Sequence, residues 1–113
     1  MLSLLSHFYR AVAWAGVIDK NNSLQLNARD GHTVAVEALL RAGADVHALD
    51  DEALRTASWW GRTGTIKVLL EGGANVHAKD DEALRWAEQQ KHTHTAALLR
   101  TWAARGPGLA PSV

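Results

Sequence analysis

An internal repeat with a period of thirty residues constrains the fold of this chain more than any other feature of its sequence. Residues 46–55 return as residues 76–85, with nine of the ten positions identical. When residues 45–74 are compared with residues 75–104, fourteen of the thirty positions are identical. A fixed period of this length is typical of solenoids, in which each unit is one supersecondary element that buries its apolar face only by stacking on its neighbours.

The same register extends towards the N-terminus. The Gly-His-Thr of residues 31–33 takes the place that Gly-Arg-Thr holds at residues 61–63. The repeat region, residues 15–104, is therefore expected to consist of three units, namely 15–44, 45–74 and 75–104.

The two ends of the chain are expected to close the stack. Apolar residues recur at helical spacing in residues 1–14, which predicts an N-terminal capping helix. The Gly-Pro-Gly of residues 106–108 stops the last helix, so residues 105–113 are expected to form a frayed C-terminal tail. The third unit is degenerate and more polar at its end, as solubility requires of a terminal repeat.

Each unit is expected to form two short α-helices, which makes the fold all-α. In the second unit, the acidic triplet at residues 50–52 is expected to cap the first helix, because carboxylates accept hydrogen bonds from the free N–H groups there. Gly61 is expected to end that helix, and Arg55 is spaced to form an ion pair with the carboxylates of the triplet. The second helix is expected to begin near Thr63 and to end at Gly72.

Two segments resemble the second helix and turn of ankyrin repeats: residues 31–48, GHTVAVEALLRAGADVHA, and residues 63–78, TGTIKVLLEGGANVHA. The resemblance extends over residues 15–104 and implies a solenoid of ankyrin-like helix-turn-helix repeats that binds other proteins. The units are shorter than the usual ~33 residues, and Glu-Ala-Leu-Arg at residues 52–55 replaces the Thr-Pro-Leu-His of the usual repeat. We therefore expect short fingers between the helix pairs.

The overall composition narrows the possible partners. Twelve Lys and Arg residues balance twelve Asp and Glu residues, so the formal net charge is zero. Neither nucleic acid nor a membrane surface is expected as a partner, because both need a basic surplus gathered on one face. No apolar run approaches the ~18 residues of a membrane-spanning helix. The chain has no cysteine, which excludes disulfides and thiolate zinc sites and fits a cytoplasmic location.

Neither the histidines nor the carboxylates form a pattern typical of a metal site or a catalytic site. His47 and His77 occupy equivalent positions of stacked units, and helices in contact lie ~10 Å apart, which is too far for one zinc ion. The carboxylates at residues 50–52 and 80–82 adjoin arginines and are expected to be solvated and paired. No phosphate loop, dinucleotide fingerprint or nucleophile elbow occurs in the sequence. We therefore expect no cofactor, no metal ion, no small-molecule substrate and no catalysis.

Two adjacent tryptophans are the candidate anchor of a binding surface. Trp59 and Trp60 align with a polar pair in each sister unit, at residues 29–30 and 89–90. Positions that are polar in sister units are expected to be exposed, because the stacked environment repeats. Two exposed tryptophans would form a large apolar patch, and Trp is enriched among the residues that dominate binding energy. In the alternative arrangement, one Trp folds over a neighbouring unit and only the other is exposed.

The resemblance to ankyrin repeats implies that these two positions face the concave groove beside the fingers. Polar residues of the sister units would flank the tryptophans, and the carboxylates of the fingers would form an acidic rim that favours a basic partner. The candidate partner-binding residues are therefore Trp59, Trp60, Arg29, Asp30, Gln89, Gln90, Asp50, Asp51, Asp80 and Asp81. Trp86, by contrast, aligns with Leu26 and Thr56 and is expected to lie in the core.

Together these observations predict a non-catalytic module that binds a protein or a peptide in its groove. Two alternatives stay open. The tryptophan pair could instead close a homodimer, because a two-fold interface uses the same patch twice. The chain could also be a regulatory or inhibitory subunit of another enzyme, which is a binding protein of a particular kind.

Overall fold

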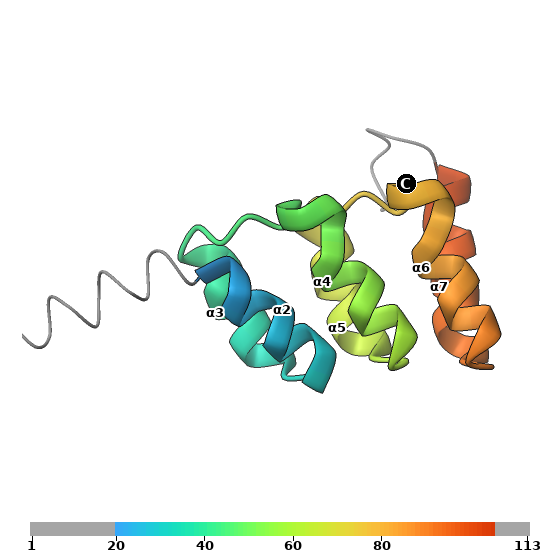
Figure 1. Ribbon diagram of the computed structural model, residues 1–113, viewed down its shortest axis with the longest axis horizontal. Helices are drawn as coiled ribbons and strands as arrows, with labels where there is room; N and C mark the ends of the chain where they lie inside the picture. The colour runs from blue at the N-terminus through green and yellow to red at the C-terminus, as the bar shows by residue number, and fades with distance from the viewer. Residues whose placement is uncertain (1–19, 106–113) are drawn as a thin grey trace, which may run out of the picture.

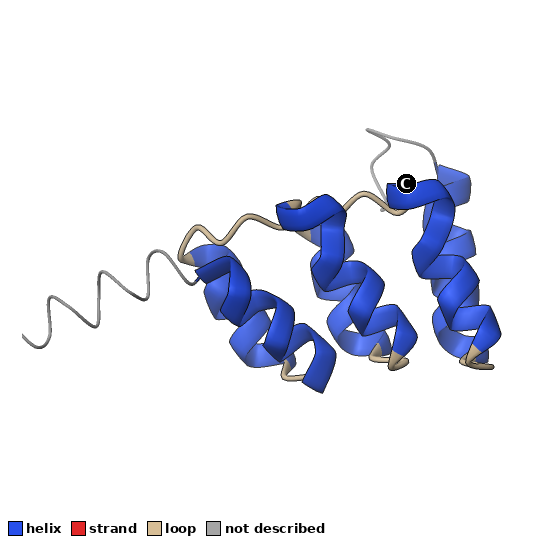
Figure 2. Cartoon of the chain, in the orientation of Figure 1, coloured by secondary structure: helices blue, strands red, loops and turns tan. Residues whose placement is uncertain are grey.

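The structure, a computed structural model, describes residues 20–105 of the 113-residue chain and consists of helices joined by turns (Figure 1). No β-strand occurs between residues 20 and 105 (Figure 2). The six helices of this region are α2 (Lys20–Asp30), α3 (Thr33–Arg41), α4 (Ala48–Trp59), α5 (Thr63–Glu71), α6 (Ala78–Gln89) and α7 (Thr93–Arg105). The predicted capping helix at residues 1–14 lies outside the described residues, as does the predicted tail apart from Arg105.

The helices form three pairs that stack side by side in two layers (Figure 1). A short turn joins the two helices of each pair, α2 to α3, α4 to α5 and α6 to α7. In the first layer α4 packs against both α2 and α6, and in the second layer α5 packs against both α3 and α7. The fold is therefore an all-α stack of helical repeats, as the sequence predicted.

The core lies between the two layers and across the joins between the pairs. Leu24, Leu54, Ile66, Leu69 and Leu99 are fully buried and come from four different helices. Burial of such a side chain contributes about 1.5–3 kcal/mol. A helix as short as α5, with nine residues, is marginal by itself. Each pair therefore depends on its neighbours for most of its apolar burial.

Glycine is needed at the turn inside the first two pairs for two separate reasons. Gly31 and Gly61 have φ values of +76° and +69°, which L-residues rarely adopt. The next pair also approaches them closely. A Cβ on Gly31 would lie 2.8 Å from the side chain of Arg62, and one on Gly61 would lie 2.6 Å from the ring of His92. The predicted helix end at Gly61 is confirmed, since α4 ends at Trp59.

The first turn of α4 is left-handed, unlike the capped helix start that the sequence suggested. Leu49, Asp50 and Asp51 have φ values of 55°, 55° and 58°, and residues 79–81 of α6 have the same conformation. No side chain caps the N-terminus of α4, so the prediction that the acidic triplet caps free N–H groups is wrong. An L-residue in this conformation costs about 1–2 kcal/mol, so other contacts must hold the turn.

Arg55 holds this left-handed turn and joins it to the next helix pair. Its Nε donates to the carbonyl of Asp50 and a terminal nitrogen donates to the carbonyl of Leu49, both at 2.9 Å. The other terminal nitrogen forms an ion pair with Glu82 of α6 at 2.5 Å, where both side chains are largely buried. The predicted ion pair within α4 is wrong, because the guanidinium group is used by the two carbonyls and by α6.

Three other kinds of hydrogen bond recur at both joins between pairs. One links two threonine hydroxyls, one runs between a side-chain nitrogen and a carbonyl of the preceding pair, and one runs from a backbone N–H to a side-chain oxygen of the preceding pair. At the first join these are Thr33–Thr65 at 2.8 Å, Arg62–Arg29 at 2.9 Å and Asp45–Asn21 at 2.6 Å. At the second join they are Thr63–Thr95 at 2.7 Å, His92–Trp59 at 3.0 Å and Asn75–Asp51 at 2.6 Å.

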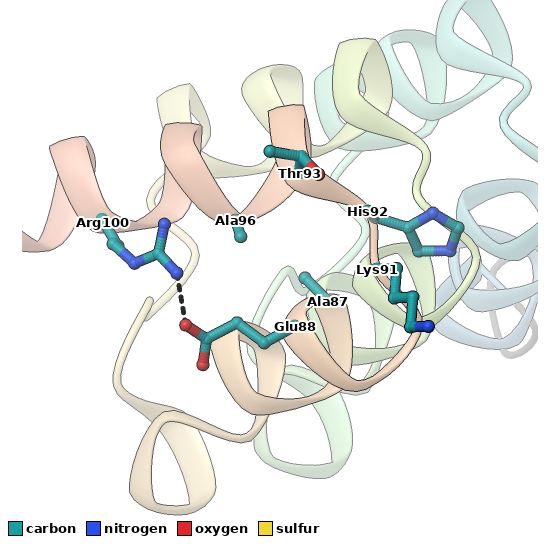
Figure 3. Close-up of a pocket in the computed structure, with 7 residues that line it drawn as sticks. All are labelled: Ala87, Glu88, Lys91, His92, Thr93, Ala96 and Arg100. Atoms are coloured by element: carbon teal, nitrogen blue, oxygen red, sulfur yellow. Dashed lines mark hydrogen bonds and ion pairs between the residues drawn. The ribbon is translucent and has the colours of Figure 1, made fainter.

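The outer face of the third pair differs from the joined faces of the first two pairs at two positions. Lys91 takes the position of Gly61 and has a φ of 61°, and Arg100 takes the position of Leu70. Arg100 forms an ion pair with Glu88 beside a hollow of about 460 Å³ (Figure 3). A further pair in the same register would bring a side chain against Lys91, where glycine leaves room in the earlier pairs. At these two positions the third pair carries charged side chains where the first two pairs carry a glycine and a leucine.

We expect the substitution Arg55→Gln to lower the free energy of unfolding by about 2–4 kcal/mol, because it leaves Glu82 and two carbonyls without their partner. Urea denaturation followed by circular dichroism measures this change. Arg85→Gln is the matched control, since Arg85 donates to the carbonyls of Asp80 and Lys79 but has no ion pair within residues 20–105. Equal losses for the two variants would contradict a stabilising role of the ion pair.

Replacing residues of the third pair by those of the second tests whether Glu88, Lys91 and Arg100 prevent stacking on its outer face. The triple variant Glu88→Ser, Lys91→Gly and Arg100→Leu removes the ion pair and the obstructing side chain, so we expect it to associate with increasing concentration. Sedimentation velocity on the variant and the wild type measures the association. Lys67→Leu, which adds an exposed apolar residue on α5, is the control for non-specific association. A triple variant that sediments like the wild type at every concentration would show that these residues do not close the face.

Candidate protein-binding surface

Trp59 is a packing residue that joins the second and third helix pairs. It is the last residue of α4, and its ring meets that of Trp86 edge to face, with centroids 5.4 Å apart and planes at 84°. The guanidinium of Arg55 lies 5.9 Å from the centroid of the Trp86 ring. Both rings are only partly buried, so the prediction that Trp86 lies in the core is wrong. Trp86 lies at the surface of the first layer, as do the equivalent residues of the other units, Leu26 and Thr56.

Trp60 occupies a different environment although it is adjacent in sequence. It follows the last residue of α4, and 50% of its surface is exposed. With Arg29, Asp30 and Arg62 it lines a hollow of about 320 Å³ between the first and second pairs. That volume is at the lower end of ligand sites in proteins. Of the two arrangements considered from the sequence, the structure has the one in which one Trp packs on a neighbour and the other is exposed.

The polar residues of the first unit form one wall of this hollow. Arg29 and Asp30 are bonded to each other, from Nε to Oδ1 at 3.0 Å. The hydrogen bond lowers the pKa of Asp30 and raises the pKa of Arg29, so both are ionised at neutral pH. Arg62 is oriented by donating its Nε to the carbonyl of Arg29 at 2.9 Å. The Arg29–Asp30 ion pair has no net charge, so the charge of Arg62 makes the hollow positive.

Arg62 is a residue of this surface that the sequence analysis did not single out. It aligns with His32 of the first unit and His92 of the third. The sequence feature that could have identified Arg62 is its position directly after the turn glycine, from which a long side chain reaches the preceding helix pair. Gln89 and Gln90 lie at the same end of the third pair, are exposed, and precede Lys91, which is exposed as well.

The acidic candidates lie at the opposite end of the first-layer helices. Asp50 belongs to the left-handed first turn of α4, whereas Trp59 is the last residue of this helix, and the right-handed residues 52–58 lie between them. Asp80 has the equivalent place in α6 and is exposed, as Asp50 is. The exposed aspartates and the tryptophans therefore lie at opposite ends of the first-layer helices. The carboxylates and Trp60 form two separate regions.

Asp51 is a structural residue, since only 4% of its surface is exposed. Its carboxylate accepts hydrogen bonds from the Nδ1 of His47 at 3.0 Å and from the backbone N–H of Asn75 at 2.6 Å. The prediction that its side chain contacts a partner is therefore wrong. Asp81, the equivalent residue of the third pair, lies against His77 and is half exposed.

The described part of the chain holds no group of three or more His, Cys, Asp or Glu residues that could bind a metal ion. His47 and His77 each lie against the carboxylate four residues later, and His92 contacts the carbonyl of Trp59. Between residues 20 and 105, no helix has the length and the apolar character needed to cross a membrane.

Comparison with known families supports the resemblance seen in the sequence. Residues 19–51 match the family model of the ankyrin repeat. This segment is similar to an ankyrin repeat. It contains α2, α3 and the left-handed turn of α4, and the two later helix pairs repeat the same arrangement. A search of curated proteins found no match for the chain.

The assignment gives the two regions of the surface their place in the ankyrin repeat. The finger of the usual repeat precedes the first helix, and here the left-handed turns at residues 49–51 and 79–81 take that place without forming strands. The hollow beside Trp60 lies instead at the turn inside the repeat, between its first and second helices. Ankyrin repeats generally mediate interactions between proteins.

The different environments of the two tryptophans predict different effects on stability. We expect Trp59→Ala to lower the free energy of unfolding by about 1–3 kcal/mol, because it removes the contact with Trp86 across the second join. Trp60→Ala should change it by less than about 0.5 kcal/mol, since the side chain is half exposed. Urea denaturation of both variants measures the difference. Equal losses would mean that Trp60 also packs into the stack.

Proposed function

We propose that this chain is a non-catalytic module that binds a protein or a peptide, with Trp60 as the anchor residue. The observation that carries the proposal is the half exposure of this large aromatic side chain beside a hollow that Arg29, Asp30 and Arg62 line. Trp and Arg are the residues most enriched among those that dominate binding energy in protein interfaces. Ankyrin repeats are typically interaction modules without catalytic activity, which supports the assignment.

In this proposal the other candidate residues have distinct parts. Trp59 supports the surface by fixing the second join, and Gln89 and Gln90 extend the surface towards the third pair. Asp50 and Asp80 form a second contact region for a partner long enough to reach the left-handed turns. The small size of the surface suits a partner that binds modestly, beside another domain or chain. The cytoplasm is the proposed compartment, in keeping with a chain without cysteine.

Affinity capture with matched baits tests this proposal. The wild-type chain, Trp60→Ala and Val34→Ala are compared as baits in lysate of the source cells, after each has shown the same helical circular dichroism. Val34 is the matched control because it is an apolar residue exposed on α3, in the second layer. We expect Trp60→Ala to lose a protein that the other two baits retain, by about thirtyfold or more if Trp60 contributes about 2 kcal/mol.

Other results would change the assignment. A protein retained equally by all three baits would move the binding surface away from Trp60. If no protein is retained, and light scattering shows that the wild type is dimeric while Trp60→Ala is monomeric, the exposed tryptophan closes a homodimer instead. A regulatory subunit of an enzyme would appear as capture of that enzyme, with a change of its activity on binding.

A further inference from the structure

The charges of this neutral chain are separated between two edges of the stack. One edge, here called the helix-turn edge, consists of the turns inside the pairs, residues 29–34, 59–64 and 89–94. It carries Arg29, Arg62 and Lys91 against the single carboxylate of Asp30. The other edge, formed by residues 20–21, 45–51 and 75–81, carries five aspartates against two lysines, Lys20 and Lys79. Although the net charge of the chain is zero, one edge of the stack is therefore basic and the other is acidic.

The two edges act separately on a partner because the first-layer helices hold them apart. The right-handed part of α4, residues 52–59, alone spans about 12 Å, which exceeds one Debye length at physiological ionic strength. A charged segment on the helix-turn edge is therefore largely screened from the aspartates at the opposite edge.

On the helix-turn edge, the cations that face a partner are Arg62 and Lys91. The charge of Arg29 is balanced by Asp30, which it contacts at 3.0 Å. Arg62 and Lys91 are both exposed, and neither forms an ion pair with any residue from 20 to 105. The bond from Arg62 Nε to the carbonyl of Arg29 fixes the guanidinium beside Trp60, so its terminal nitrogens need not be ordered when a ligand binds.

We propose that the partner presents an acidic segment with an apolar side chain, and that this segment lies along the helix-turn edge. The apolar side chain enters the hollow beside Trp60, and carboxylates on either side of it contact Arg62 and Lys91. Arg binds carboxylates in a bidentate manner, which gives such a contact direction as well as charge. This inference rests on the proposed function, since it describes the partner of the same Trp60 surface.

A protein segment suits this edge better than single-stranded nucleic acid. Proteins that bind single strands stack successive bases on several aromatic side chains in a basic groove. Within residues 20–105, Trp60 is the tryptophan of the helix-turn edge that is half exposed, whereas Trp59 is partly buried against Trp86. One apolar anchor with cations along the same edge matches a peptide in which a single apolar residue is flanked by Asp or Glu.

Selection from a random peptide library tests the inference without assuming a sequence. Peptides of about twelve residues are selected on the wild-type chain after removal of those that bind Trp60→Ala. We expect the selected peptides to be enriched in Asp and Glu around one aromatic or aliphatic residue. A selected peptide should bind about tenfold more weakly to the double variant Arg62→Gln and Lys91→Gln, and more weakly at high salt. Lys67→Gln, an exposed lysine of α5, is the matched control and should not weaken it.

The outcomes separate this inference from the proposed function. Selected peptides that lack carboxylates, or that bind the double variant as tightly as the wild type, would overturn the acidic partner and leave Trp60 as an anchor. Failure to select any Trp60-dependent peptide would count against both. Tighter binding of a short oligonucleotide than of the selected peptides, at the same residues in an NMR titration, would replace the acidic segment by nucleic acid.

Discussion

No helix pair of this chain can bury its apolar side chains by itself, and the joins between pairs supply the burial that is missing. The joins are specified by polar contacts as well as by apolar packing. At each join a threonine pair, a side-chain contact to a carbonyl and a backbone N–H bonded to a side-chain oxygen recur with the period of the sequence. Such directional contacts fix the register of one pair on the next, which apolar packing alone would leave less defined.

The joins also decide which surface residues are available to a partner. Asp51 and Trp59 have polar or exposed counterparts in the other units, yet each is used at the second join, by Asn75 and by Trp86. Trp60 is next to Trp59 but lines the hollow between the first and second pairs and remains half exposed. The candidate binding surface therefore consists of side chains that the joins do not use. It lies at the turns inside the repeats rather than beside the reduced fingers.

The sequence was sufficient for the fold and only partly sufficient for the site. The period, the apolar residues and the turn glycines predicted the helix pairs and the end of α4, because these features depend on local conformation and on stacking. The left-handed turns were missed, since Asp at a helix start usually caps it, and here the competing contact is the side chain of Arg55. The burial of Asp51 was missed for a similar reason. Its partner, Asn75, is twenty-four residues away and belongs to the next unit.

The third turn has Lys91 where the first two turns have glycine, and this difference affects how the array of repeats could lengthen. Gly31 and Gly61 each receive a side chain of the following pair, whereas Lys91 occupies that space itself. A duplicated copy of the second unit could be inserted ahead of the third, because it would meet a glycine on one side and offer a glycine on the other. The same copy placed behind the third unit would meet a lysine and a charged face. Insertion between the second and third units would therefore keep the glycine contacts of the existing joins, whereas addition behind the third unit would not.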